Sequence, residues 1–218
     1  MDNQNIKEFN QKLLEWYKIN KRKFPWRKGG KSIYEILIAE ILLRKTTAGM
    51  VSEFFPNFIN KYPNLKSIQE IPIEILERDL MPLGLYKTRA EIFKKIANEI
   101  IIKNNGIIPD EYEALISLYG IGKYIANAVL CFGYNKRAIL VDTNIKRIFS
   151  RFLNKDYPIK INDNHPLWNE LDNLITEGTD KIFFMALIDF GALVCKKRNY
   201  NCSKCPIFEL CNYNQKSI

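Results

Sequence analysis

Long hydrophobic runs are missing from this sequence. None of its apolar stretches approaches the roughly 18 residues that a membrane-spanning helix needs. The N-terminal segment MDNQNIKEFNQ has no apolar core of the kind that a secretory signal peptide carries. Low-complexity segments and repeats of fixed period are also absent from the sequence. We therefore expect a cytoplasmic protein that is neither secreted nor bound to a membrane.

Acidic residues are too few to balance the basic ones. The 218 residues include 33 Lys and Arg against 24 Asp and Glu, which gives a formal net charge of +9. Because 47% of the residues are hydrophobic, a chain of this length can bury a substantial core. A basic balance in such a protein favours contact with nucleic acid, although a solvated lysine surface would give the same count.

Helical periodicity dominates the chain, and the predicted class is all-α. Pro, Gly, Asn or Asp separates most of the predicted helices, which cover residues 5–19, 33–47, 48–60, 73–79, 87–103, 110–118, 123–132, 143–151, 166–175 and 181–193. We expect Ser32 to cap the nearly all-apolar helix 33–47, and Asp110 to cap helix 110–118. Only residues 138–141 have strand propensity. Because they have no partner strand, we predict a buried extended segment there.

Four of the five cysteines lie within the last 24 residues. Cys195, Cys202, Cys205 and Cys211 are separated by six, two and five residues. Four thiols this close in a cytosolic chain indicate a metal site rather than disulfides. Zinc usually takes two tight cysteine pairs, and only one such pair is present, whereas an iron–sulfur cluster accepts wider spacing. The spacing favours iron–sulfur and leaves zinc as the alternative. The remaining cysteine, Cys131, lies in an apolar stretch and is expected in the core.

Two glycines, Gly120 and Gly122, flank Ile121 between two predicted helices. Glycine permits a tight turn and the close approach of another backbone, and we expect Ile121 to point inward. The amides that begin the second helix would then face a phosphate, and Lys123 would add a positive charge beside it. The pattern therefore predicts a helix–hairpin–helix that binds DNA. A plain corner between two helices, with glycines for turning, is the alternative.

Two carboxylates stand out from their surroundings. Asp142 precedes an amphipathic stretch, where it is either a helix N-cap or a carboxylate that stabilises a positively charged sugar and orients water. Glu40 lies on the nearly all-apolar helix and needs a partner or a proton if it is buried. It either pairs with Arg44 one turn later or acts as an acid or base lining a pocket.

Taken together, these motifs resemble the endonuclease III superfamily of DNA glycosylases, in which a helix–hairpin–helix precedes an aspartate and four cysteines. Residues 24–27, Phe-Pro-Trp-Arg, and residues 39–43 are similar to MutY-type adenine glycosylases. Residues 40–49 together with 120–124 are closer to archaeal thymine–DNA mismatch glycosylases, which remove T or U opposite G. The resemblance spans nearly the whole chain.

The resemblance implies two helical lobes with a DNA-binding cleft between them. A six-helix barrel over residues 25–136 would contain the hairpin. Residues 1–24 and 137–218 would form a lobe in which the four cysteines hold a 4Fe-4S cluster. Glu40 and Asp142 would face the cleft.

The residue after Lys123 bears on the chemistry. Bifunctional members of the superfamily carry a catalytic lysine there, and this chain has Tyr124, whose phenol cannot form a Schiff base with the sugar. The resemblance therefore implies a monofunctional glycosylase that leaves an abasic site for a downstream abasic-site endonuclease. Asp142 would stabilise the oxocarbenium ion, while Glu40 and Tyr124 would contact the extruded base.

The resemblance also assigns residues that contact DNA. Arg44 and Leu85 would probe or wedge the gap as the base leaves the stack. Gly120, Gly122 and Lys123 would hold the strand through its phosphates. The expected partner is double-stranded DNA with a mismatched base, bound by a monomeric, nucleoid-associated protein.

One departure from the superfamily concerns the hairpin itself. Tyr119 stands where the hairpin usually has a proline, and we expect this change to loosen the turn. Three other functions stay open at this point. One is an adenine glycosylase acting on A:G mismatches, and another is a bifunctional glycosylase with lyase activity. The third is a non-enzymatic DNA-binding protein with a zinc or redox cluster.

Overall fold

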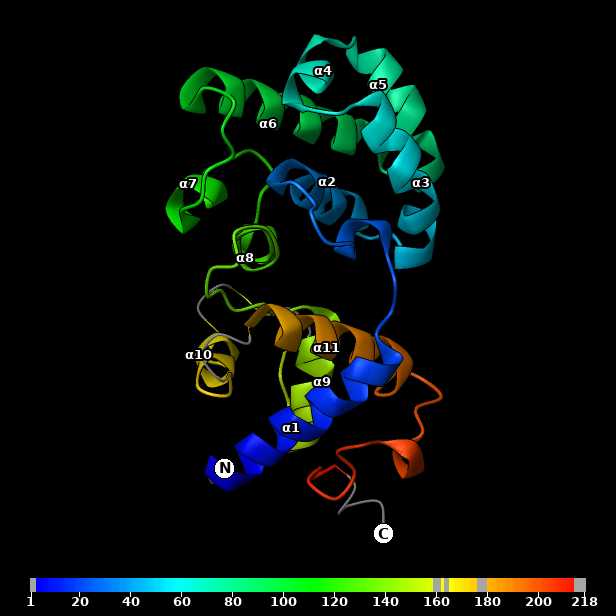
Figure 1. The fold of residues 1–218 in the computed structure, drawn as a ribbon, viewed down its shortest axis with the longest axis vertical. Coiled ribbons are helices and arrows are strands. Elements are labelled where there is room, and N and C mark those ends of the chain that lie inside the picture. Colours follow the sequence, from blue (N-terminus) through cyan, green and yellow to red (C-terminus); the bar gives the residue numbers. More distant parts are fainter. Residues whose placement is uncertain (1–2, 159–161, 163–164, 176–179, 214–218) are drawn as a thin grey trace. The chain divides into compact units, whose positions relative to one another are not determined.

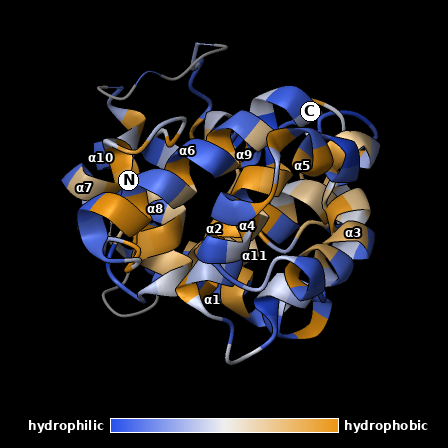
Figure 2. Ribbon diagram, turned by 90° about the horizontal axis from the view of Figure 1, so that it is seen from above, coloured by the Kyte–Doolittle hydropathy of each residue, from blue (hydrophilic) through white to orange (hydrophobic). Residues whose placement is uncertain are grey.

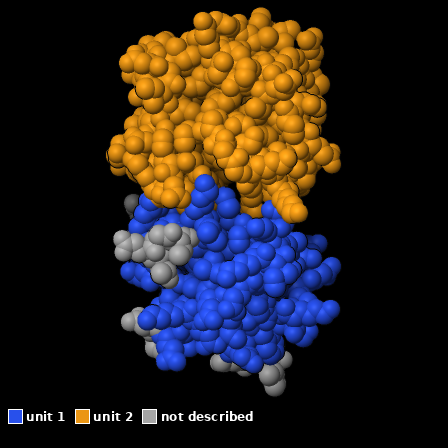
Figure 3. Space-filling view, viewed as in Figure 1, with its two compact units in different colours: residues 1–22, 137–218 blue, residues 23–136 orange. Residues whose placement is uncertain are grey.

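The computed structural model describes all residues except 1–2, 159–161, 163–164, 176–179 and 214–218. Every regular element in the described residues is helical, which confirms the predicted all-α class (Figure 1). Contacts divide the chain into two compact units, residues 23–136 and residues 1–22 with 137–218 (Figure 3).

The unit of residues 23–136 is built around one buried helix, α2. The helices of this unit, in chain order, are η1 (Pro25–Arg27), α2 (Ile33–Leu43), α3 (Ala48–Lys61), α4 (Leu65–Glu70), α5 (Ile73–Leu80), η2 (Met81–Leu83), α6 (Tyr86–Asn104), α7 (Tyr112–Ile116), α8 (Lys123–Ala128) and the π-helical turn η3 (Val129–Gly133). Helix α2 packs on η1, α3, α8 and η3, and residues 36–42 are all buried. Ser32 and Glu35 form a capping box at its start, which confirms the predicted cap.

Two helix ends in this unit differ from prediction. The helix predicted over 33–47 stops at Leu43, because Lys45 adopts a left-handed φ of 54° and Thr47 caps a new helix, α3. The cap predicted at Asp110 is wrong. The side chain of Asp110 pairs with Lys136 at 2.7 Å instead, and α7 begins only at Tyr112.

Helix α4 was not predicted. It has only six residues and begins at an Asn64–Ser67 capping box, so it is too short for a periodic signal. The stretch predicted as one helix over 123–132 begins as α8 and continues as the π-helical turn η3. Cys131 is fully buried in that turn, as predicted.

The second unit joins the N-terminal helix to the C-terminal third of the chain. Its helices are α1 (Asn3–Asn20), α9 (Thr143–Leu153), α10 (Leu167–Asp172), α11 (Asp180–Leu193) and η4 (Cys202–Lys204). Helix α11 packs on both α1 and α9. The fully buried carboxylate of Asp189 accepts hydrogen bonds from the Arg22 backbone N–H at 2.8 Å and from its Nε at 2.7 Å. Because the Asp189 carboxylate is fully buried, this contact secures the segment after α1 to α11.

Aromatic side chains fill the core of this unit. The Phe9 ring of α1 lies 5.7 Å from Phe149, 4.5 Å from Phe152 and 6.5 Å from Phe183, measured between ring centroids. Residues 138–141 form no strand, and Ala138 and Leu140 are buried, as the prediction of an extended segment requires. Figure 2 shows hydrophobic and hydrophilic residues mixed along most helices, the pattern of amphipathic helices around a core. Among the described helices, none combines the length and the apolar character that crossing a membrane requires.

Candidate functional site

The two glycines of the hairpin are present for different reasons. Gly120 has a φ of 72°, and a Cβ built there would lie 2.8 Å from Cγ1 of Ile92, so both the backbone and the packing require glycine. Ile121 is 6% exposed and its N–H donates to the Leu118 carbonyl at 3.1 Å, which anchors the turn as predicted. Gly122 has a φ of −101°, and no atom of the described chain lies within 4 Å of its Cβ position. The space beside Gly122 is therefore open.

Tyr119 braces the hairpin against α6. Its backbone N–H donates to Glu99 Oε2 at 3.3 Å, and its hydroxyl donates to Glu91 Oε1 at 3.0 Å. The Lys95 ammonium lies 3.7 Å from the centroid of the Tyr119 ring. A proline has no N–H and could not make the first of these bonds. Three contacts from α6 thus hold Tyr119 at the turn, and the expected loosening stays a prediction.

The ends of α2 and η2 present Arg44 and Leu85. Arg44 Nη1 donates to the Gly120 carbonyl at 3.0 Å, which links the end of α2 to the hairpin. Leu85 has a left-handed φ of 50°, and its side chain is 51% exposed immediately before α6. Glu40 lies one turn before Arg44 on α2 and is 6% exposed. Leu85 thus combines an exposed apolar side chain with a left-handed backbone conformation.

Helix α8 begins directly at the hairpin. Its first two residues, Lys123 and Tyr124, are half-buried, and both contact other residues of the protein. Because Gly122 is the N-cap residue, the side chains of Lys123 and Tyr124 are positioned by the same turn that Gly120 makes possible. Gly120, Gly122, Lys123 and Tyr124 therefore belong to one local structure in the unit of residues 23–136.

Asp142 is the N-cap of α9. Its Oδ1 accepts the Ile145 N–H at 2.7 Å, and its Oδ2 accepts a bond from Asn144 Nδ2 at 3.1 Å. The predicted cap is thus confirmed. Burial raises the pKa of Asp142 above its usual range, and the bonds from Ile145 and Asn144 oppose that rise by favouring the carboxylate. A carboxylate held in one orientation by two donors can stabilise positive charge developing nearby.

Arg147 joins the Asp142 cap to the cysteine loop. Its Nη2 donates to Asn144 Oδ1 at 2.8 Å and to the Gly191 carbonyl at 2.7 Å, and its Nε donates to the Cys195 carbonyl at 2.8 Å. A Cβ on Gly191 would lie 2.6 Å from the Cβ of Asn144, so glycine permits this approach of α11 to α9. Asn144 and Arg147 were not predicted from the sequence as site residues. The available signal was their three-residue spacing, which puts them on one face of the helix that Asp142 caps.

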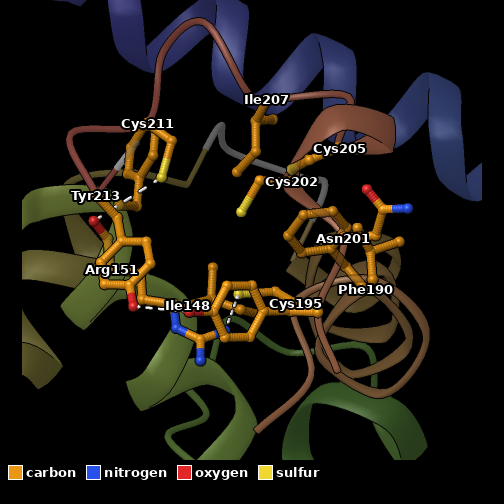
Figure 4. A pocket seen from close by; sticks show the side chains of 13 residues that line it. Ile148, Arg151, Phe190, Cys195, Asn201, Cys202, Cys205, Ile207, Cys211 and Tyr213 are labelled. Carbon is orange, nitrogen blue, oxygen red and sulfur yellow. Dashed lines mark hydrogen bonds between the residues drawn. The ribbon is translucent and has the colours of Figure 1, made fainter. Parts of the chain in front are cut away.

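The four clustered cysteines line a single pocket in the unit of residues 1–22 and 137–218. Figure 4 shows their sulfur atoms around this pocket, with Ile148, Phe190 and Ile207 as apolar neighbours. Arg151 covers one side of the pocket. Its Nη1 lies 3.4 Å from Cys195 Sγ, and its guanidinium carbon lies 4.1 Å from the centroid of the Tyr200 ring.

The donor set of this pocket suits a metal cluster. Burial and the neighbouring thiols raise the pKa of the Cys205 thiol to about 12, so a thiolate at Cys205 requires a positive centre beside it. Within the described part of the chain, no three His, Cys, Asp or Glu side chains come close enough together to hold a single metal ion. Four cysteine side chains around one pocket are a donor set that a metal centre can use.

Comparison with known proteins extends these observations. The sequence profile described as "HhH-GPD superfamily base excision DNA repair protein" matches residues 38–162, which include Glu40, the hairpin and Asp142. A thymine/uracil-DNA glycosylase of Methanothermobacter thermautotrophicus is 36% identical over 215 residues, which cover 98% of this chain and 96% of that protein. An adenine DNA glycosylase of Buchnera aphidicola subsp. Baizongia pistaciae is 35% identical over 207 residues, which cover 93% of this chain and 57% of that protein.

Two solved structures of DNA repair enzymes have a fold similar to that of this chain. A thermostable thymine-DNA glycosylase superimposes with a TM-score of 0.91 at 35% identity, covering 98% of both chains. An endonuclease III in a non-covalent complex with DNA superimposes with a TM-score of 0.85 at 25% identity, covering all of this chain and 98% of the other. Both structures are similar to this chain over nearly its whole length.

Proposed function

The chain belongs to the HhH-GPD superfamily of base excision DNA repair proteins, and we propose that it is a DNA N-glycosylase that removes thymine or uracil mispaired with guanine. One observation carries the choice of base. The thermostable thymine-DNA glycosylase superimposes on 98% of this chain with a TM-score of 0.91, and the relative named thymine/uracil-DNA glycosylase is 36% identical over the same share of the chain. The substrate would be a duplex with one mismatched base, bound by a monomer.

Asp142 is the proposed catalytic carboxylate. When the N-glycosidic bond breaks, the electron pair leaves with the base, and positive charge develops at the sugar C1′ and ring oxygen. An ionised Asp142 would stabilise this charge and orient the water that adds to C1′. The bonds from Ile145 and Asn144 support this role, since they favour the carboxylate form and fix its orientation.

The proposed base pocket uses Glu40 and Tyr124. Glu40 would hydrogen-bond the edge of the extruded base, and the Tyr124 ring would pack against it. Because Tyr124 carries no amine, the reaction ends at an abasic site without a Schiff base, and strand cleavage falls to a separate abasic-site endonuclease. The half-buried position of Tyr124 at the start of α8 is compatible with a ring that forms a wall.

The proposed DNA contacts lie around the hairpin. The amides near Gly120, Gly122 and Lys123 would bind phosphates, and the open space beside Gly122 supports a close approach of the DNA backbone there. Leu85 would enter the gap left by the extruded base, for which its exposure is suitable. Arg44 would probe the same gap from the end of α2.

The four cysteines would hold a 4Fe-4S cluster. When bound, the cluster would supply four iron–thiolate bonds that close residues 195–211 into one loop. The chain's own contribution is the pocket itself, together with Arg151 beside Cys195 and the Arg147 bond to the Cys195 carbonyl. A zinc site predicts a colourless protein, and iron analysis with visible absorption decides between the two.

The test is a base-release assay on labelled duplexes containing G:T, G:U, G:A or a matched pair, each read with and without alkali. We expect the T or U strand to break only after alkali, since an abasic site is alkali-labile. Release of adenine from G:A alone would assign the protein to the adenine glycosylases. Covalent trapping by borohydride would contradict the proposed role of Tyr124, and no release from any duplex would contradict the proposed function.

A further inference from the structure

Two residues with an unusual backbone conformation lie close to the proposed DNA contacts. The non-glycine residues with positive φ in the described chain are Lys45, Leu85, Asn105, Asn135, Asn154 and Asn199. Asparagine tolerates this region because its side chain bonds the local backbone. Lys45, with a φ of 54°, and Leu85, with a φ of 50°, have no such compensation and are strained. Contacts from other residues must therefore stabilise Lys45 and Leu85 in these conformations.

One buried cation, Arg89, contacts both strained segments from the first turn of α6. Its Nη2 donates to the Arg44 carbonyl and to Thr46 Oγ1, each at 2.5 Å, and to the Leu42 carbonyl at 3.3 Å. These acceptors lie on both sides of Lys45, so they fix the chain before and after the strained residue.

The other guanidinium nitrogen of Arg89 contacts the second segment. Its Nη1 donates to the Leu83 carbonyl at 2.9 Å and to the Gly84 carbonyl. Both carbonyls directly precede Leu85. The side chain of Arg89 is thereby shared between two loops that are about forty residues apart in the chain, separated by α3, α4 and α5.

The chemistry of this contact indicates a role beyond stability. Arg89 is 2% exposed, and each acceptor that it uses is a neutral carbonyl or hydroxyl oxygen. Its Nε is buried and has no hydrogen-bond partner in the described chain. A buried guanidinium without a carboxylate is an inefficient way to stabilise a fold, since its charge must be desolvated and only dipoles compensate it. Such arrangements persist at sites that function selects.

We propose that Arg89 is a positioning residue for base extrusion. It holds the Arg44–Thr46 and Gly84–Leu85 segments together in the strained conformations that present Arg44 and Leu85 to DNA. Arg89 itself touches neither DNA nor the base. The inference rests on the proposed function only in naming base extrusion as the step that Arg89 serves. The joint ordering of the two segments can be tested without any substrate.

The helix α6 provides a matched control. Lys94 is half-buried on the same helix and also donates to three carbonyls, those of Ile68, Gln69 and Ile71, at 3.1, 2.6 and 2.5 Å. Lys94 therefore makes the same kind of contact, but to the end of α4 rather than to either strained segment. The variants are Arg89→Lys, Lys94→Met and the milder Thr46→Val, which leaves the buried charge in place and removes one Arg89 acceptor together with the 3.4 Å bond from Thr46 Oγ1 to the Leu83 carbonyl.

Hydrogen exchange of the whole protein, read by mass spectrometry, tests the joint ordering. In Arg89→Lys we expect exchange to accelerate about tenfold both in the segment after α2 and in the segment before α6, because one guanidinium serves both. In Lys94→Met the acceleration is confined to the end of α4. If Arg89→Lys fails to fold, Thr46→Val carries the same comparison. Acceleration in only one segment, or in neither, overturns the proposal.

Base release on two duplexes tests the functional part. On G:U we expect Arg89→Lys and Thr46→Val to release uracil about tenfold more slowly than the unchanged protein, with little change in duplex affinity. When the uracil lies opposite an abasic site it needs less extrusion, and the defect should shrink to about threefold or less. Lys94→Met should show the same ratio on both duplexes. Equal defects of Arg89→Lys on both duplexes would overturn the positioning role. If the unchanged protein releases no base, the proposed function fails, and the exchange experiment still decides the joint ordering.

Discussion

Replacing each hairpin glycine by alanine separates folding from DNA contact. At Gly120 the φ of 72° costs an alanine about 1–2 kcal/mol. The new Cβ would also lie 2.8 Å from Cγ1 and 3.1 Å from Cδ1 of Ile92, and relieving that overlap costs about 1 kcal/mol more. Alanine restricts the unfolded chain and recovers about 0.4–1 kcal/mol. We expect Gly120→Ala to lower the free energy of unfolding by about 2 kcal/mol.

Gly122→Ala should behave in the opposite way. The φ of −101° and ψ of 172° suit any residue, and the Cβ position has no neighbour within 4 Å in the described chain. Alanine is a poorer N-cap than glycine, so the expected loss of stability is below about 1 kcal/mol. The added methyl group, however, occupies the space through which we propose that a phosphate approaches. We expect duplex affinity to fall about tenfold or more.

Thermal unfolding and duplex titration at fixed salt measure the two effects. For a chain of this size about 1 kcal/mol corresponds to about 2–4 °C, so Gly120→Ala should lower Tm by about 4–8 °C and Gly122→Ala by less than half of that. Equal losses of Tm would refute the assignment of separate roles to the two glycines. Unchanged affinity in Gly122→Ala would refute the approach of DNA at the open face of the hairpin.

Four further predictions concern the aspartate cap and the cysteine pocket. Asp142→Asn should lower single-turnover base release at least about 100-fold with duplex affinity within about threefold, and normal turnover would exclude Asp142 as the catalytic carboxylate. Because Asp142 must be ionised and burial raises its pKa, base release should fall, as the pH is lowered, at a pH above the usual aspartate value of about 3.9. Asn144→Ala removes a bond that favours the carboxylate, so the midpoint of the pH–rate profile should move further up, and a downward shift would contradict this reading. Cys202→Ala should lose iron and visible absorbance and should weaken duplex binding, whereas retention of iron would remove Cys202 from the ligand set.

Local chemistry explains what could be predicted from the sequence. The Ser32 capping box, the Asp142 cap, the inward Ile121 and the buried Cys131 depend on neighbouring residues within a few positions. The helix–hairpin–helix is recognisable for the same reason, because its turn requires glycine at Gly120. Such features leave a signature in the order of residues, and secondary structure follows from them without knowledge of the remaining fold.

Features that depend on distant residues were predicted less well. The helix predicted over 33–47 ends at Leu43, and its apolar run gives no warning of the left-handed Lys45. The hairpin was expected to be looser because Tyr119 stands where a proline is usual. The contacts of Tyr119 with Glu91, Lys95 and Glu99 could not be predicted, because these residues lie on another helix. The contacts printed on these two segments, from Arg89 to the Arg44 carbonyl and from Tyr119 to Glu99, join residues at least twenty positions apart. Sequence order alone does not reveal which segments meet.

Arg89 is a residue whose burial can be predicted from the sequence, although its partners cannot. It lies in helical register with Phe93, Ile96 and Ile100, so a charged residue interrupts the apolar stripe of α6. The same criterion, a charge on a buried face, is what singled out Glu40 on the helix that begins at Ile33. Applied to α6, this criterion predicts that Arg89 is buried and needs hydrogen-bond partners. It could not have named them, because the acceptors are mostly backbone carbonyls, which every residue carries. The sequence thus predicts that a charge on a buried helix face needs partners. The structure places those partners beside Lys45 and Leu85, the two residues with an unusual backbone conformation.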